Sequence, residues 1–374
     1  MKEGWRYEKL DDLGTIVTGA TPSTNDESNY FPKEYCFVKP SDLPLNGVGS
    51  IHETENYVSS KGLSVSRPLP AGSVLTTCIG TIGKVGLLLQ EGCTNQQINA
   101  VIPNNKINSR YLAYALLSIR KQLEFIANAP VVPIINKKCF SKIHIGYPPK
   151  PTQLSIVSEL DKINELIRIK KEQLKDYDTL AQSIFYEMFG DPVVNEKGWE
   201  MKTLGHICEI TSSKRVFANE YVDTGVPFYR SKEVIEKSKQ LPISVELYIS
   251  ESHYNKIKSS FGVPQIGDIL VTAVGTIGKI WVVDTNEPFY FKDGNLVWLR
   301  NIKGAHCEYF RYSLFYLIDE YKKVNANGAA YNALTIAKLK LMLCPLPPLS
   351  LQQSFAQKIE QIEQQKAAIQ KTIT

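Results

Sequence analysis

The chain repeats itself, and this internal duplication constrains its fold more than any other feature of the sequence. The phrase GTIGK stands at Gly80–Lys84 and again at Gly275–Lys279, 195 positions further along a chain of 374 residues. Other matches lie on both sides of it: Gly4-Trp5 with Gly198-Trp199, Leu10 with Leu204, Ile16 with Ile210, Asn99 with Asn295, and Pro148-Pro149 with Pro347-Pro348. Because the offset drifts by only a few residues, we expect two lobes of one common fold that differ by small loop insertions.

The repeated phrase lies inside β-branched runs, and this context predicts a hairpin in each copy. The segments SVLTTCIGTIGKVGLLL and DILVTAVGTIGKIWVV are typical of two buried strands joined by a tight glycine turn. A phosphate loop is excluded by spacing, because it needs four residues between its glycines and a Ser or Thr after its lysine. Here two residues separate the glycines, and Val85 and Ile280 follow the lysines.

Each copy then has an aromatic-rich helix, a Pro-Pro stop and a long helix with a heptad pattern. After Pro151 apolar residues recur at alternating steps of four and three, and a helix of about 38 residues at about 1.5 Å each would be roughly 55 Å long. Two apolar stripes can cover each other, so the pattern favours an antiparallel coiled coil over packing of each stripe onto a lobe. The predicted pairing residues are Ile156, Leu160, Ile163, Ile167, Leu174, Tyr177 and Ile184 in the first helix and Phe355, Ile359, Ile362 and Ile369 in the second.

The predicted fold is α+β, with an internal pseudo-two-fold duplication. Two small, mixed, β-rich lobes at residues 1–150 and 191–350 would be separated by a central helix at 151–190, which pairs with a distal helix at 351–374. The distal helix is about 14 residues shorter than a full copy of the central one, so part of the central helix is expected to be unpaired. Lobes held by such a rod would act as a molecular ruler.

The composition indicates the compartment in which the protein works and argues against a metal site. No run of about 18 apolar residues and no apolar leader occurs, so we expect a cytoplasmic protein without a membrane span. The seven cysteines are scattered without a CxxC pair, which is typical of free thiols in a reducing compartment. His206 with Cys208 and His306 with Cys307 lack a second ligand pair at zinc spacing, so no metal site is expected.

Motifs of nucleic-acid-modifying and hydrolytic enzymes are missing from the sequence: FxGxG, [DN]PP[YF], a Walker pair, GxSxG and HExxH. Glu320 begins an E-x-K triplet, but it stands in a predicted helix and is interpreted as a solvated side chain. Two non-catalytic lobes on a spacer suggest recognition of two separated targets, and the helical repeat of DNA suits modules held at a set distance. The net charge of +5, with a basic excess in both lobes, permits this ligand. The alternative is a non-enzymatic adaptor or structural protein whose lobes bind protein partners.

The order of these motifs resembles the specificity subunit of type I restriction-modification systems. The first copy carries TGATPST (Thr18–Thr24), FVKPSDL (Phe37–Leu43), GTIGK and NQQINA (Asn95–Ala100) before its Pro-Pro stop and heptad helix. The second copy carries TSSKR (Thr211–Arg215), GVPFYRSKE (Gly225–Glu233), GTIGK, NANGAAYNAL (Asn325–Leu334) and CPLPPLSLQQSFAQKI. This resemblance covers essentially the full chain.

The resemblance implies a non-catalytic subunit with two target recognition domains, each of which reads one half of a split, asymmetric double-stranded DNA sequence. The helices would set the length of the unread spacer and dock two modification subunits, which hold S-adenosylmethionine. Restriction subunits, which are ATP-dependent translocases and nucleases, would bring ATP and Mg²⁺. No cofactor is implied for this chain itself.

Candidate DNA contacts lie in the predicted loops and in the hairpin turn of each copy. In the first copy they are Ser23, Thr24, Lys39, Thr81, Lys84, Asn95, Gln96, Gln97 and Asn99, and in the second they are Lys214, Arg215, Tyr229, Arg230, Lys232, Thr276, Lys279, Lys292 and Asn295. Amides can pair bidentately with adenine, Arg215 and Arg230 are the expected guanine readers, and Lys, Ser and Thr mostly hold phosphates. Each residue could instead be a solvated loop side chain or a turn cap. For NANGAAYN (residues 325–332) a structural loop is favoured over base contact.

Overall fold

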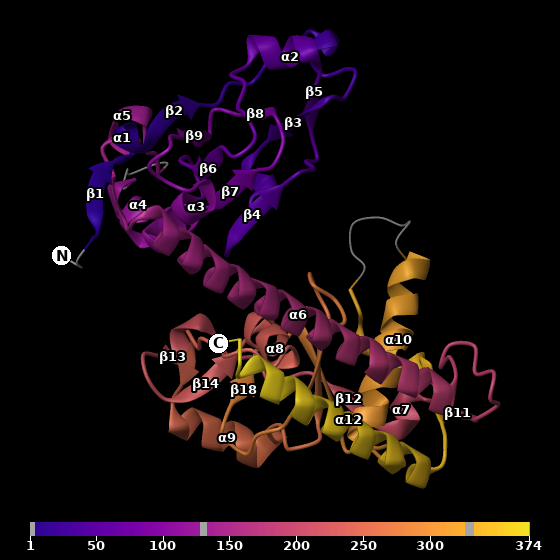
Figure 1. Ribbon diagram of the computed structural model, residues 1–374. Helices are drawn as coiled ribbons and strands as arrows, with labels where there is room; N and C mark the ends of the chain where they lie inside the picture. The colour runs from indigo at the N-terminus through magenta and orange to yellow at the C-terminus, as the bar shows by residue number, and fades with distance from the viewer. Residues whose placement is uncertain (1–3, 128–132, 326–332, 374) are drawn as a thin grey trace. The chain divides into compact units, whose positions relative to one another are not determined.

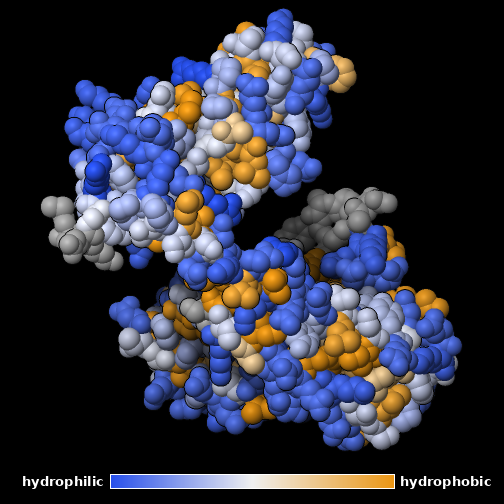
Figure 2. All heavy atoms as spheres, viewed as in Figure 1, coloured by the Kyte–Doolittle hydropathy of each residue, from blue (hydrophilic) through white to orange (hydrophobic). Residues whose placement is uncertain are grey.

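The computed structural model describes residues 4–127, 133–325 and 333–373, which form two compact units divided between Ile169 and Lys170 (Figure 1). The helix α6 (Lys150–Phe189) contributes its first half to one unit and its second half to the other. On the face shown in Figure 2, hydrophilic residues predominate and hydrophobic residues form smaller patches among them. No helix of the described residues has the length and apolarity needed to cross a membrane.

The first unit is built on a five-stranded sheet in the order β2-β9-β6-β7-β4, in which only the β4–β7 pair is parallel. A three-stranded sheet, β5-β3-β8, and the ribbon β1-β10 complete its strands. The strands are β1 (Arg6–Lys9), β2 (Gly14–Thr18), β3 (Tyr35–Val38), β4 (Val48–Ile51), β5 (Tyr57–Val58), β6 (Val74–Thr77), β7 (Val85–Leu88), β8 (Gly92–Thr94), β9 (Ile98–Pro103) and β10 (His144–Tyr147). The helices are α1 (Leu10–Leu13), η1 (Glu27–Asn29), η2 (Pro40–Asp42), α2 (Ser60–Val65), α3 (Ser109–Ser118), α4 (Arg120–Ile126) and α5 (Lys137–Ser141).

The second unit repeats this plan with the sheets β12-β19-β16-β17 and β13-β15-β14-β18 and the ribbon β11-β20. Its strands are β11 (Glu200–Thr203), β12 (Glu209–Thr211), β13 (Tyr221–Val222), β14 (Val226–Tyr229), β15 (Tyr248–Ile249), β16 (Ile269–Thr272), β17 (Ile280–Val282), β18 (Tyr290–Phe291), β19 (Leu296–Arg300) and β20 (Leu343–Leu346). Its helices are α7 (Leu204–Ile207), η3 (Ala218–Glu220), α8 (Ser231–Ser238), α9 (Glu251–Phe261), α10 (Cys307–Asn325), α11 (Ile336–Leu341) and α12 (Leu349–Gln370).

Strand register shows that the two units are copies of one fold. Val101 lies opposite Ile16 on one side and opposite Val74 on the other. In the second unit Leu299 lies opposite Ile210 and Ile269. The predicted duplication and α+β class are therefore confirmed.

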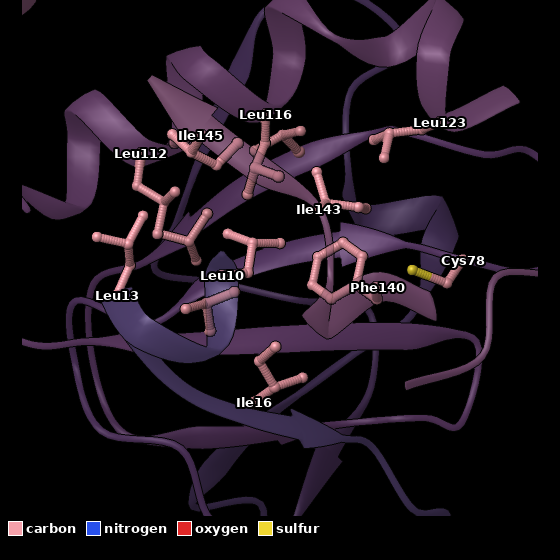
Figure 3. Close-up of a cluster of buried hydrophobic side chains, with 14 of the residues drawn as sticks. Leu10, Leu13, Ile16, Cys78, Leu112, Leu116, Leu123, Phe140, Ile143 and Ile145 are labelled. Carbon is pink, nitrogen blue, oxygen red and sulfur yellow. The ribbon is translucent and has the colours of Figure 1, made fainter. Parts of the chain in front are cut away.

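Each lobe buries an apolar core between its aromatic-rich helix and one sheet, which is β2-β9-β6-β7-β4 in the first lobe and β12-β19-β16-β17 in the second. In the first lobe this core includes Leu10, Leu13, Ile16, Leu112 and Leu116 (Figure 3). The helix α3 begins at an Asn108 cap, whose side chain accepts hydrogen bonds from the backbone N–H groups of Arg110 and Tyr111, and it buries five apolar residues from Tyr111 to Leu116. Full burial of each large apolar side chain contributes about 1.5–3 kcal/mol, so this helix is held mainly by packing.

All seven cysteines are free, and five of them are buried. Burial raises the pKa of the Cys78 and Cys208 thiols to about 12. These thiols therefore act as small apolar side chains.

In the second unit the second half of α6 packs antiparallel against α12. Asp178 pairs with Lys366 at 2.8 Å, and Lys170, which is earlier in α6, donates a hydrogen bond to the later residue Thr372 at 2.7 Å. The predicted pairing residues Tyr177, Ile184, Phe355, Ile359 and Ile362 lie in this apolar cluster, and Leu174 and Ile369 are half-buried.

Other predicted pairing residues lie elsewhere. Ile156 packs against the core of the first lobe, because the first turns of α6 lie against that lobe. Ile163 is 51% exposed, and Leu160 and Ile167 are half-buried. Within the second unit the most buried α6 side chains are Ala181, Phe185 and Phe189, and the two phenylalanines were not among the residues that the heptad pattern indicated.

Candidate nucleic-acid interface

The repeated GTIGK phrase forms the turn of a hairpin in each lobe, as the sequence predicts. In the first lobe the Thr77 hydroxyl donates to the carbonyl of Thr81 at 2.5 Å and accepts from the backbone N–H of Lys84 at 3.0 Å. The backbone N–H of Gly83 donates to the carbonyl of Thr77 at 2.9 Å. One buried threonine thus closes the turn from inside.

The second lobe repeats these bonds atom for atom. The Thr272 hydroxyl donates to the carbonyl of Thr276 and accepts from the N–H of Lys279 at 2.9 Å, and the N–H of Gly278 donates to the carbonyl of Thr272. Gly278 has a φ of +83°, and a Cβ placed there would lie 2.8 Å from Ile318 Cγ2. Glycine is therefore required here both by the backbone conformation and by the close approach of α10.

Several loops of the first lobe meet around this turn. We define the first loop cluster as residues 18–24, 38–40, 78–84 and 94–97. Backbone hydrogen bonds join them: Ala20 N to Thr94 O at 2.9 Å, Cys78 N to Gln97 O at 2.8 Å, and Asn95 N to Val38 O at 3.2 Å. Loops that are distant in sequence therefore present one composite surface.

The residues of the first lobe that were predicted to contact DNA differ in their exposure. Ser23, Thr24, Thr81 and Gln96 are exposed, Lys39, Lys84 and Gln97 are half-buried, and Asn95 and Asn99 are buried. Asn99 is only 2% exposed, and its amide accepts a hydrogen bond from the Thr18 hydroxyl at 2.6 Å and donates one to the carbonyl of Ile135 at 3.3 Å. This asparagine is therefore engaged in holding loops together.

The cations of the first loop cluster also have partners within the lobe. Lys84 Nζ donates to the carbonyl of Pro40 at 2.7 Å, and Lys39 Nζ donates to Asn56 Oδ1 at 3.0 Å. Gln96 remains exposed, with its Oε1 accepting from the Thr21 hydroxyl at 2.7 Å. Thr21 was not predicted from the sequence, and its pairing with Gln96 across 75 positions left no local signal.

An equivalent second loop cluster comprises residues 211–215, 229–232, 273–279 and 291–295. The N–H of Ala273 donates to the carbonyl of Asn295, and the N–H of Lys292 donates to the carbonyl of Tyr229, both at 2.8 Å. Lys214, Thr276, Lys279, Lys292 and Asn295 are all exposed. In the predicted loop NANGAAYN, Asn325 is the last residue of α10, and residues 326–332 lie outside the described residues.

The arginines of the second loop cluster are held by carboxylates. Arg215 is 67% exposed at its side chain and pairs through Nε with Asp293 at 2.8 Å. Arg230 pairs with the buried Glu233 at 2.8 Å and with Glu246 at 2.9 Å, and these bonds raise its pKa further above the ordinary arginine value. The sequence could not indicate Asp293 and Glu246 as partners because they lie in separate segments, whereas Glu233 is only three residues from Arg230.

Tyr229 and Lys232 have different environments within the same cluster. Tyr229 is 5% exposed and stacks on Phe289 with ring centroids 4.8 Å apart, and burial raises its pKa to about 12. Lys232 is exposed and pairs with Glu246 at 2.6 Å, a contact that lowers the pKa of the carboxyl. Tyr229 is thus a core residue, whereas Lys232 is on the surface.

Among the residues that the structure describes, no group of three His, Cys, Asp or Glu side chains is placed to hold a metal ion. The two loop clusters instead offer hydroxyls, amides and cations on a rigid frame, which is the chemistry of phosphate and base-edge recognition. These features define a class of protein with two related recognition lobes, each joined to a long helix.

The chain belongs to the family of type I restriction modification DNA specificity domains, whose model matches residues 2–176 and 196–374. It is 27% identical over 253 residues to the type I restriction enzyme MjaIX specificity subunit of Methanocaldococcus jannaschii, a match that covers 62% of this chain and 58% of that protein. It is 32% identical over 167 residues to the type I restriction enzyme HindI specificity subunit of Haemophilus influenzae, covering 42% and 36% of the two chains.

Two solved structures share the fold. The S subunit of a type I restriction-modification system from M. genitalium aligns with a TM-score of 0.52 at 15% identity, covering 99% of this chain and 92% of that chain. A chain from a structure of complex assembly and conformational transition of the type I R-M system aligns with a TM-score of 0.59 at 21% identity, covering 100% and 93%. Both alignments run over the two lobes and the helices.

Proposed function

We propose that this chain is the DNA sequence-recognition subunit of a type I restriction-modification complex. The observation that carries the proposal is the duplicated hairpin frame, which gathers exposed Thr, Gln, Lys and Arg side chains into one loop cluster per lobe. Each lobe would read one half of a bipartite DNA target, with cations at phosphates and amides or arginines at base edges. Membership in the DNA specificity domain family supports the same conclusion.

The two clusters differ in chemistry, and this supports an asymmetric target. Both clusters present a hydroxyl and an exposed amide, Gln96 in the first and Asn295 in the second. The second cluster adds exposed cations, which are Lys214, Arg215, Lys232, Lys279 and Lys292. Amides suit adenine and arginines suit guanine. The two half-sites would therefore have different sequences.

The chain would have no catalytic role of its own. Two modification subunits with S-adenosylmethionine would dock on the helices and methylate the DNA, and restriction subunits with ATP and Mg²⁺ would cleave it. The helices would set the length of the unread spacer. A complex that acts on cellular and incoming DNA would work in the cytoplasm.

The test is to co-express the chain with modification subunits and to map methylated adenines across the host genome. One bipartite motif with a fixed gap and two different halves is the expected result. If the complex forms and binds S-adenosylmethionine but methylates no defined motif, the proposal fails.

A second test uses salt, because phosphate contacts release counterions and make the binding constant fall steeply with salt concentration. Replacement of Lys279 by Ala should reduce the salt slope by about one ion equivalent while leaving the recognised motif unchanged. Salt-insensitive binding of a protein partner by the lobes would instead indicate an adaptor.

A further inference from the structure

Gln153, in the first turn of α6, is fully buried and makes three hydrogen bonds within the first unit. Its Oε1 accepts from the backbone N–H of Asn108 at 2.8 Å. Its Nε2 donates to the carbonyl of Lys106 at 3.2 Å and to the carbonyl of Pro148 at 2.9 Å. One amide therefore joins the start of the long helix to the loop that enters α3.

Gln352, in the first turn of α12, makes the same three bonds within the second unit. Its Oε1 accepts from the N–H of His306 at 2.8 Å, and its Nε2 donates to the carbonyls of Gly304 at 3.3 Å and Pro347 at 2.7 Å. This residue too is fully buried. The arrangement is thus duplicated along with the lobes.

A tyrosine in each lobe adds a second tie beside the amide. Tyr111 of α3 donates its hydroxyl to the carbonyl of Gly146 at 2.9 Å, and Tyr309 of α10 donates to the carbonyl of Pro345 at 2.7 Å. Both acceptors lie in the strand that leads into the following long helix. Each long helix is therefore linked to its lobe by a buried amide, and the strand that precedes it is linked by a tyrosine hydroxyl.

We infer that Gln153 and Gln352 are positioning residues that fix the direction of each long helix relative to its own lobe, and thereby the spacing of the DNA sequence that the protein recognises. This inference rests on the proposed function. The chemistry requires glutamine, because only a side-chain amide can accept one hydrogen bond and donate two from a single flat group. A carboxylate of the same shape could not donate, and an apolar side chain would take the side-chain partner from three backbone groups, of which the bond to Pro148 or Pro347 is buried.

The buried glutamine forms a joint between the long helix and its lobe. Because the helix is long, the position of its far end is sensitive to the angle at this joint. At about 1.5 Å per residue, 20 residues of helix extend about 30 Å from the joint. A change of about 10° at the joint displaces the far end of that segment by about 5 Å, which exceeds the rise of about 3.4 Å per base pair of DNA. A loose joint would let the protein accept more than one spacer length and would raise the entropic cost of binding both half-sites at once.

The experiment compares wild type with Gln153→Met and Gln352→Met, each purified as the full chain in complex with modification subunits. Binding is measured on DNA with the native spacer, with one base pair added or removed, and with one half-site alone. Methionine keeps the length of the side chain and removes all three hydrogen bonds. The matched control is Gln353→Met, because Gln353 is the exposed neighbour of Gln352 in the same helix.

We expect each buried variant to lose about tenfold in affinity for the native spacer, which corresponds to about 1.4 kcal/mol, and to discriminate less against altered spacers. Half-site affinity should stay at the wild-type value, and Gln353→Met should behave as wild type throughout. Variants that keep the wild-type ratio between native and altered spacers would overturn the inference, as would an equal loss of half-site binding, which would indicate damage to the lobe. If wild type itself ignores the spacer, the proposed function fails and the inference with it.

Discussion

Phe185 lies at the centre of the contact between α6, α10 and α12 in the second unit, and its replacement by alanine should destabilise that unit strongly. The side chain is fully buried. Its ring centroid lies within 6 Å of five other rings: Phe189 at 5.2 Å, Tyr316 at 5.4 Å, Phe355 at 5.6 Å, and Tyr309 and Tyr312 at 5.8 Å.

The magnitude follows from the lost burial and the cavity that remains. Phe→Ala in a core costs about 3–5 kcal/mol, and the loss of several aromatic pairs, each worth about 0.5–1.5 kcal/mol, places Phe185→Ala at about 4 kcal/mol or above. With a urea m-value of about 2 kcal/mol/M, the unfolding midpoint should fall by about 2 M. Phe185→Leu, which keeps most of the volume, should cost less than half as much.

Tryptophan fluorescence during urea unfolding measures this change, because three of the four tryptophans, Trp199, Trp281 and Trp298, belong to the second unit. The control is Leu180→Ala, in the same helix but 46% exposed, which should shift the free energy of unfolding by at most about 0.5 kcal/mol. If Phe185→Ala costs no more than Leu180→Ala, the three-helix packing is not what holds this unit together.

Four further substitutions test the turn and one ion pair. Gly278→Ala should lower the melting temperature more than Gly275→Ala: both positions have a positive φ, which costs about 1–2 kcal/mol for a residue with a Cβ, but only at Gly278 would the new methyl group clash with a neighbouring side chain. Thr272→Val should cost about 1–3 kcal/mol in urea unfolding, because it removes the buried hydroxyl that closes the turn. The hydrogen bond from Arg300 lowers the pKa of Glu209 below its ordinary value of 4.5, so this stabilisation is present above pH 4.5 and is lost as the pH falls through the lowered pKa. Glu209→Gln should remove this dependence of stability on acid pH, and the loss should be under about 1 kcal/mol because the side chain is nearly half exposed. The measurement is the free energy of unfolding between pH 3 and pH 7. If the pair contributes nothing, this free energy will depend on pH in the same way in the variant and in wild type.

The elements of each lobe could be predicted from the sequence because their signals are local. β-branched runs around paired glycines indicate a hairpin, and the hairpins lie at the predicted places. The heptad pattern also placed the two long helices, and α12 pairs with the second half of α6. It did not identify Phe185, because the buried face of α6 is set by a third helix, α10, and periodicity within one helix cannot reveal how many partners it has.

The candidate contacts were harder to predict because burial is set by distant segments. Asn95, Gln96 and Asn99 stand within five positions of each other, yet only Gln96 is exposed. The Asn99 side chain is engaged by Thr18, 81 positions earlier, and nothing in the local pattern separates an amide that holds loops together from one that faces solvent. Tyr229 is buried for a similar reason, since its stacking partner Phe289 lies in another strand region.

In both lobes, the groups that make the hydrogen bonds of the fold are different from the exposed side chains that are available for recognition. Backbone groups and the buried side chains of Thr77, Thr272, Gln153 and Gln352 make the same bonds in both copies. Several of the exposed side chains around those bonds differ between the copies, such as Gln96 in the first cluster and Arg215, which pairs with Asp293, in the second. Because the shared bonds do not involve the exposed side chains, substitutions at the exposed positions should change which half-site a lobe binds with little effect on its stability. Substitutions at the shared positions should lower the stability of the lobe with little effect on which half-site it binds.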